Sequence, residues 1–178
     1  MKERLEIIFS GVGGQGLLLI GELLGSAASI IEKRQAVMTS AYGTEARGTF
    51  TKADLILSDS YIDFPEVLSA DVVIALAPVA YERYAPNMRK DSILIYNSDK
   101  VTEAVSPAQQ HGVPTETLAV SAGSFSSQNM VALGALLKLT GCAHVDSVKE
   151  MIRRRFTGKD HLIEINISAL EAGYTQQY

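Results

Sequence analysis

The stretch from Leu5 to Leu24 constrains the fold of this chain most, because a glycine cluster separates two apolar segments. The first segment is short and strand-like, and the second has the composition of a helix beginning near Gln15. The cluster contains Gly11, Gly13, Gly14 and Gly16. Its G-x-G-x-x-G spacing is typical of a tight strand-to-helix turn, in which glycine lets the backbone approach a phosphate. The pattern therefore predicts a strand, a turn and a helix whose N-terminus is available to an anion.

The glycine spacing alone leaves two interpretations open, since the same turn can serve packing between a strand and a helix. Binding of a nicotinamide or flavin dinucleotide also requires an acidic residue at the end of the second strand, roughly 20 residues further on, to hold the ribose hydroxyls. The second apolar stretch, Ala36 to Met38, ends in Thr39 and Ser40. No acidic residue stands there, which argues against ordinary dinucleotide binding.

Composition limits the classes of protein that this chain can belong to. Its 178 residues, 47% of them hydrophobic, suffice for one substantial core and predict a single domain over residues 1–178. A formal charge of −4, without an aromatic-rich basic run, argues against nucleic-acid binding. Cys142 is the only cysteine, so the chain can form no internal disulfide and cannot by itself supply four thiolates to an iron–sulfur cluster. We expect a buried structural thiol and a cytoplasmic protein.

The apolar region from Ile7 to Ile31 carries a single charge, Glu22. Glycines and Gln15 interrupt it, so it predicts neither a membrane span nor a signal peptide. Between Leu17 and Ile31 the apolar residues cover nearly the whole circumference of a helix, which predicts burial on all sides. We expect one side of this helix to face the sheet and the other to face another subunit, with a homodimer as one state of the isolated chain.

The stretch from Thr39 to Phe50 is the second unusual segment, predicted to be a loop. Tyr42, Glu45 and Arg47 lie in it, between and beside two glycines, so its charges follow no helical or strand period. Large polar residues in loops often carry function. A surface loop closed by a contact between Glu45 and Arg47 is the alternative, and the sequence favours neither.

The remainder of the chain alternates strand-like and helix-like segments. Strands are predicted at 49–58, 71–76, 92–96 and 115–120, the first of them a candidate sheet edge, and helices at 78–84, 129–140, 145–156 and 159–172. This alternation predicts an α/β fold, namely an open, mostly parallel, Rossmann-like sheet with helices on both faces. The loops after the first two strands would then leave the same edge of the sheet and lie close together.

Taken together, these motifs resemble the gamma subunit of 2-oxoacid:acceptor (ferredoxin) oxidoreductases, the family that acts on 2-oxoglutarate, pyruvate or 2-ketoisovalerate. The resemblance covers nearly the whole chain. It is carried by GVGGQG at 11–16, by S-x-x-G-x-E-x-R-G at 40–48, by ADLILSD at 53–59, by ADVVIAL at 70–76 and by Asn129 opening a late helix. One departure is Ala41, which separates Ser40 from Tyr42 where the family commonly reads S-Y-G.

The resemblance implies a complex that decarboxylates a 2-oxoacid, transfers the acyl group to coenzyme A and reduces ferredoxin. Thiamine diphosphate and Mg are expected on alpha and beta subunits, and iron–sulfur clusters on other subunits, among them a ferredoxin-like delta subunit. For this chain the resemblance implies no catalytic residue and no metal ligand. It implies that the chain lines the approach of coenzyme A, with candidate ligand-binding residues Gly11, Gly13, Gly14, Gln15, Gly16, Tyr42, Glu45, Arg47 and Asn129.

Within this site Arg47 could offer a paired donor fork to a phosphate or to a partner's carboxylate, with Glu45 fixing its orientation. Two functions of other classes remain open at this point. One is a free-standing dinucleotide-dependent oxidoreductase that uses the same turn. The other is a regulatory nucleotide-binding module.

Overall fold

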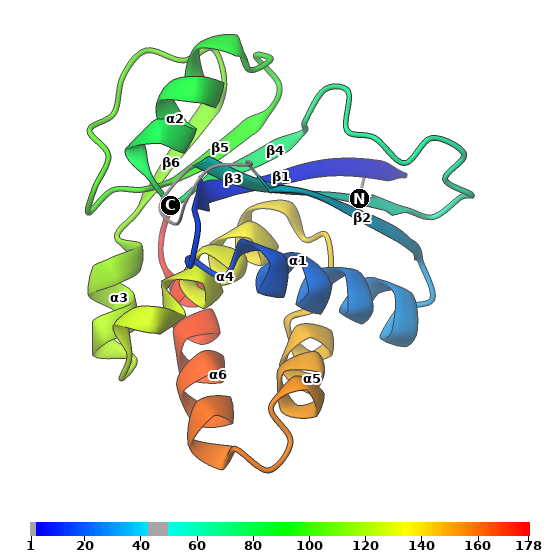
Figure 1. Ribbon diagram of the computed structural model, residues 1–178, viewed down its shortest axis with the longest axis vertical. Helices are drawn as coiled ribbons and strands as arrows, with labels where there is room; N and C mark the ends of the chain where they lie inside the picture. The colour runs from blue at the N-terminus through cyan, green and yellow to red at the C-terminus, as the bar shows by residue number, and fades with distance from the viewer. Residues whose placement is uncertain (1–2, 43–49) are drawn as a thin grey trace.

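The computed structural model describes residues 3–42 and 50–178 and shows one open sheet flanked by helices (Figure 1). In chain order the described elements are β1 (Arg4–Val12), α1 (Leu17–Ser26) with a π-helical extension (Ala27–Ile31), β2 (Gln35–Tyr42), β3 (Phe50–Ser58), β4 (Val72–Ala75), α2 (Pro78–Tyr84), β5 (Ile93–Asn97), β6 (Gln109–Val113), α3 (Thr115–Ser121), α4 (Gln128–Thr140), α5 (Val145–Arg155) and α6 (Asp160–Thr175). None of the helices in this described part is long and apolar enough to cross a membrane.

The sheet has the strand order β2-β3-β1-β4-β5-β6 among the described residues. The pairs β1–β4, β4–β5 and β5–β6 are parallel, whereas β3 runs antiparallel to both β1 and β2. Strands β1 and β2 therefore point in the same direction, and the prediction of an α/β, mostly parallel sheet is confirmed. The prediction that β3 could be an edge strand is wrong, because β2 lies outside it and buries it.

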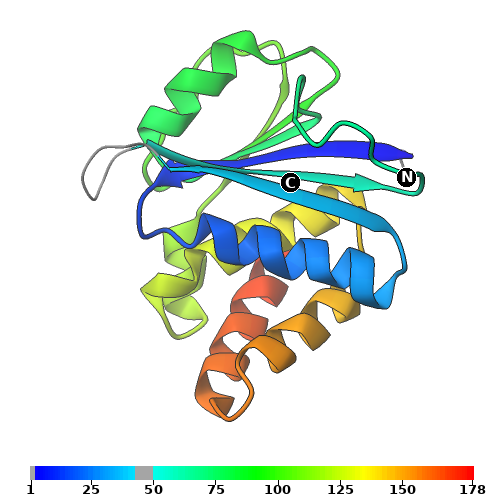
Figure 2. The same cartoon turned by 45° about the vertical axis from the view of Figure 1, so that its right-hand side comes forward.

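The helices cover both faces of the sheet, as predicted. Helix α2 lies on one face, while α1 and α4 lie on the other, with α5 and α6 forming a further layer beyond them (Figures 1 and 2). Helix α4 is the centre of this thick side, since every residue from Gln128 to Leu137 is buried. The helix ends at a left-handed glycine, Gly141 (φ 60°), a residue type that commonly ends helices.

Most apolar side chains of α1 are buried by other parts of the same chain. Leu17, Ile20 and Leu24 are buried in the large core beneath the sheet, which also contains Met151 and Ile152 of α5. Helix α5 packs against part of the second side, whereas Glu22, Ser29 and Ile30 stay exposed, so the expected contact with another subunit remains a prediction.

Two local predictions are wrong for reasons of tertiary structure. Residues 115–120 form helix α3 rather than a strand, because the Asp99 carboxylate accepts the amides of Glu116 (2.8 Å) and Thr117 (3.0 Å) at the helix start. The sixth strand is Gln109–Val113 instead. The second strand continues to Tyr42, because it pairs with β3 along its whole length, so residues 39–42 are strand and not the predicted loop.

Candidate ligand site at the carboxyl edge of the sheet

The glycine turn between β1 and α1 has the geometry of an anion-binding turn. Gly14 (φ 97°) and Gly16 (φ 70°) adopt left-handed conformations that favour glycine, and no side chain caps the helix that Gly16 precedes. The Ile20 amide donates to the Gly16 carbonyl at 3.3 Å and begins the helical ladder. The amides ahead of it have no partner inside the helix and stand at the positive end of its dipole. The predicted strand, turn and helix are confirmed.

The Gln15 side chain holds the conformation of the turn through two hydrogen bonds. Its Oε1 accepts the Val12 amide at 2.8 Å, and its Nε2 donates to the Leu76 carbonyl beyond β4 at 3.1 Å. A Cβ at Gly11 would lie 2.2 Å from this Oε1, which explains the glycine at that position. Gln15 therefore fills the space between β1 and β4, where open α/β sheets commonly receive ligands.

Asn129 ties the start of α4 to the start of α1. Its Nδ2 donates to the Gly16 carbonyl at 3.1 Å, and the side chain is only 4% exposed. A Cβ at Gly16 would lie 2.3 Å from the same Nδ2. The structure thus brings Asn129, predicted from a distant part of the sequence, into contact with the glycine turn.

A cavity of about 310 Å³ lies against the outer side of the turn. It is lined by Val12, Gly13, Gly14, Gln15, Gly16, Leu17, Leu18 and Thr51. A Cβ at Gly14 would meet no atom within 4 Å, so the backbone is accessible there. The backbone of the glycine turn thus borders a cavity whose other walls are mainly apolar.

The end of β2 reaches the same edge of the sheet. Tyr42 pairs with Thr51 of β3, which in turn pairs with Gly11 of β1, so the three backbones form one row across the sheet. At the usual strand spacing, Tyr42 and Gly11 are about 10 Å apart. Glu45 and Arg47, the other candidates of this loop, lie outside the described residues.

A polar cluster that the sequence analysis missed lies on the α2 side of the same edge. Asp54 is 8% exposed, and its Oδ2 accepts from Lys52 Nζ at 2.6 Å, while its Oδ1 is buried without a hydrogen-bond partner in the described part of the chain. Burial raises the pKa of the nearby Tyr84 hydroxyl. The positive charge of Lys52 and a hydrogen bond with Ser10 lower this pKa, but by less. The alternation of Lys52 and Asp54 along β3 was the available signal, but it indicated a partly exposed strand and hence a candidate sheet edge.

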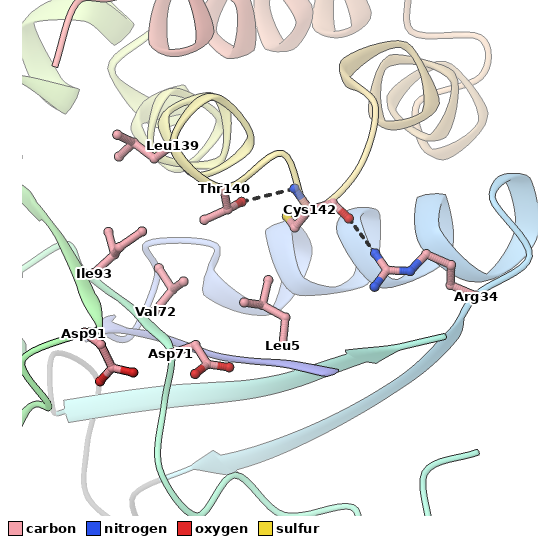
Figure 3. Close-up of a pocket in the computed structure, with 9 residues that line it drawn as sticks. All are labelled: Leu5, Arg34, Asp71, Val72, Asp91, Ile93, Leu139, Thr140 and Cys142. Carbon is pink, nitrogen blue, oxygen red and sulfur yellow. Dashed lines mark hydrogen bonds between the residues drawn. The ribbon is translucent and has the colours of Figure 1, made fainter. Parts of the chain in front are cut away.

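A second, mostly apolar cavity of about 210 Å³ opens at the opposite edge of the sheet (Figure 3). Leu5, Val72 and Ile93 mark the beginnings of β1, β4 and β5 in its wall. Arg34 Nη1 donates to the Cys142 carbonyl at 2.7 Å, as Figure 3 shows. Because ligands of open α/β sheets bind at the carboxyl ends of strands, we assign the candidate site to the glycine turn and not to this cavity.

Cys142, in the wall of this second cavity, is 2% exposed, which confirms the predicted buried thiol. Burial raises the pKa of the thiol from 9.0 to about 11. The unfolded chain ionises first, so this contribution to stability is complete below about pH 9 and is lost as the pH rises to about 11.

We expect the free energy of unfolding of the wild type to fall by about 2–3 kcal/mol more than that of Cys142→Ala across this range. Urea titrations at both ends of the range measure it, and parallel pH profiles would contradict it.

Strand order gives a further reason against ordinary dinucleotide binding. In that class of fold the second strand lies beside the first, so that its terminal acid reaches the ribose. Here β3 separates β2 from β1.

Within the described residues, no three His, Cys, Asp or Glu side chains are grouped so as to hold a metal ion. The fold and site define an α/β protein whose glycine turn is held in place by hydrogen bonds from Gln15 and Asn129.

Comparison with known proteins identifies the family. The chain matches the family described as pyruvate ferredoxin/flavodoxin oxidoreductase over residues 6–176. It is 34% identical over 156 residues to the 2-oxoglutarate synthase subunit KorC of Methanocaldococcus jannaschii, covering 85% of this chain and 83% of that subunit. The KorC subunit of Methanothermobacter thermautotrophicus is 35% identical over 178 residues, covering 96% and 93%.

Solved structures agree with this match. The gamma subunit of a keto/oxoacid ferredoxin oxidoreductase from Geobacter sulfurreducens superposes with a TM-score of 0.85 at 32% identity, covering 96% of this chain and 94% of that one. A 2-oxoglutarate:ferredoxin oxidoreductase from Magnetococcus marinus shares the fold with a TM-score of 0.86 at 23% identity, and this chain spans 31% of that longer chain.

The chain belongs to the pyruvate ferredoxin/flavodoxin oxidoreductase family. The predicted gamma-subunit type is confirmed, as is the prediction that the chain is a subunit of an oxidoreductase complex.

Proposed function

We propose that this chain is the gamma subunit of a thiamine diphosphate-dependent 2-oxoacid:ferredoxin oxidoreductase that forms an acyl-coenzyme A. Alpha and beta subunits would hold thiamine diphosphate and Mg, and other subunits the iron–sulfur clusters. The KorC relatives favour 2-oxoglutarate as the first acid to test. A single buried cysteine fits this division, because a cluster requires several accessible thiolates.

The role proposed for this chain is to receive the phosphates of coenzyme A. The observation that carries it is the braced glycine turn, whose amides and helix dipole face a cavity of about 310 Å³. Each such contact with an anion contributes about 0.3–1 kcal/mol when exposed and more when partly buried. Gln15 and Asn129 hold the turn in place through the Leu76 and Gly16 carbonyls, so the donors are already oriented before a ligand binds.

Arg47 and Glu45 complete the proposed site on the basis of sequence. A guanidinium presents parallel donors to a phosphate, which an ammonium group cannot do. The segment that carries them starts after Tyr42 and ends at Phe50, and Phe50 pairs with Val12 beside the glycine turn. Both flanks thus lie at the edge of the sheet that carries the turn, with Phe50 next to it, and this supports the proposal that Arg47 reaches the same ligand.

The test uses the reconstituted complex, with ferredoxin reduction measured while coenzyme A and the 2-oxoacid are varied in turn. We expect Gly14→Ala to raise the apparent KM for coenzyme A about tenfold, because its methyl group enters the cavity and its left-handed backbone is strained. We expect Arg47→Lys to raise the same KM several-fold, because an ammonium group lacks the paired donors. The KM for the 2-oxoacid should not change. The matched control is Gly158→Ala, since Gly158 (φ 78°) is also left-handed with no atom within 4 Å of a Cβ, but lies between α5 and α6.

Three other results are informative. Unchanged kinetics in Gly14→Ala and Arg47→Lys would contradict a coenzyme A site on this chain. Weakened assembly with a normal KM would show that the turn contacts a partner subunit instead. Failure of the complex to turn over any 2-oxoacid would contradict the proposed function itself.

A further inference from the structure

Strand β2 leaves a long, uncharged sheet edge. In the described part of the chain it is hydrogen-bonded to β3 alone. Its eight residues, QAVMTSAY, include no proline and no charged side chain. Natural edge strands are normally blunted by lysine, proline, a bulge or a covering segment, because their outer N–H and C=O groups accept another strand. Among the described residues, β2 carries none of these protections.

The other edge strand, β6, is protected. It has only five residues, mostly polar. Gln110 accepts from the Tyr81 hydroxyl at 2.5 Å, and the His111 ring packs edge-on against Tyr178 at 6.3 Å between centroids. The two edges of the same sheet therefore differ in length, polarity and cover.

A groove of about 240 Å³ lies between β2 and α1. It is lined by Gly21, Glu22, Gly25, Ser26, Ser29, Ala36, Met38 and Leu55. Helix α1 approaches the strand closely, since a Cβ at Gly21 would lie 3.0 Å from the Met38 methyl carbon. Small residues beside the edge leave space for the side chains of an added strand.

We propose that β2 pairs antiparallel with β2 of a second copy of this chain, about a two-fold axis near Thr39, so that one sheet continues through the dimer. A two-fold interface places each residue near its own counterpart, and like charges directly opposite each other are destabilising. A strand without charges meets this condition, and main-chain hydrogen bonds supply the affinity. Thr39 and Ser40 are both exposed and uncharged. This inference uses neither the glycine turn nor the proposed function.

The experiment is sedimentation equilibrium of the isolated chain of 178 residues. The wild type is expected to dimerise, and Thr39→Lys and Thr39→Glu each to weaken the dimer at least tenfold, because two like charges then meet near the axis. An equimolar mixture of the two variants should recover the dimer through opposite charges. The matched control is Gln109→Lys on the exposed part of β6, which should dimerise like the wild type. Hydrogen exchange should show β2 amides protected in the wild type and exposed in each Thr39 variant.

Circular dichroism and melting temperature establish that each Thr39 variant is folded before its association is interpreted. A wild type that stays monomeric overturns the proposal. Dimers that persist in both Thr39 variants, or an equal loss in Gln109→Lys, also overturn it, because the interface then lies elsewhere. If the mixture of Thr39→Lys and Thr39→Glu does not dimerise, the two Thr39 residues are far apart in the dimer, and the two-fold pairing is overturned.

Discussion

Gly134→Ala is expected to destabilise the chain by at least about 3 kcal/mol and to abolish folding if native stability is modest. Helices α4 and α6 cross with their backbones in contact at this point. A Cβ on Gly134 would lie 2.1 Å from the Leu170 carbonyl oxygen, and one on Gly173 would lie 2.0 Å from the Val131 carbonyl oxygen. Neither oxygen can move without shifting its helix, and α4 is buried on all sides. The cost therefore exceeds the gain of about 1 kcal/mol in helix propensity that alanine brings.

The matched control for this substitution is Gly21→Ala in α1. Gly21 is also a buried helical glycine, but its added Cβ would meet the flexible end of Met38 at 3.0 Å instead of backbone. We expect this variant to fold with a stability close to that of the wild type. Thermal and urea unfolding of both variants measure the difference. If Gly134→Ala melts within a few degrees of the wild type, the close crossing of α4 and α6 is not required for stability.

Gly16→Ala has the second largest expected effect, a loss of about 1.5–3.5 kcal/mol of stability. A left-handed alanine costs about 1–2 kcal/mol, and displacing the Asn129 amide from the Gly16 carbonyl costs about 0.5–1.5 kcal/mol more. The new Cβ would lie 2.3 Å from Asn129 Nδ2, so both terms apply together. For a chain of this size the melting temperature should fall by about 3–14 °C.

A double-mutant cycle isolates the contact with Asn129. Asn129→Ala removes the clashing amide, so the double variant should be less destabilised than the sum of the two single variants. Simple additivity would show that Gly16 is required for its backbone conformation alone. The same variants, assembled into the complex, would show how the coenzyme A KM depends on the brace that joins α1 to α4.

Much of the architecture follows from local patterns in the sequence. The apolar run before Gly11 placed β1 correctly, because glycine permits the tight turn that ends the strand, and the predicted helix at 78–84 is α2. Residues 115–120 were misassigned, since their β-branched side chains favour a strand while the cap from Asp99, sixteen or more residues earlier, determines a helix. Long-range capping is not visible in local propensity.

The candidate site was only partly predictable. The glycine turn and Asn129 were identified from sequence, and the structure joins them by a hydrogen bond of 3.1 Å. The hydrogen bond from Gln15 to the Leu76 carbonyl and the buried oxygen of Asp54 were not predicted, because both depend on which strands lie beside β1 and β3. The roles of Tyr42, Glu45 and Arg47 stay predictions.

The sequence by itself determined the α/β class, the glycine turn that opens α1 and the likeness to the gamma-subunit family, because these depend on spacing between near neighbours in the chain. Tertiary structure alone decided that β3 lies between β1 and β2, that α5 covers part of the outer side of α1, and that β2 forms an open edge. Strand order and helix packing join residues far apart in the chain. They are selected by total burial and hydrogen bonding, which no single segment encodes.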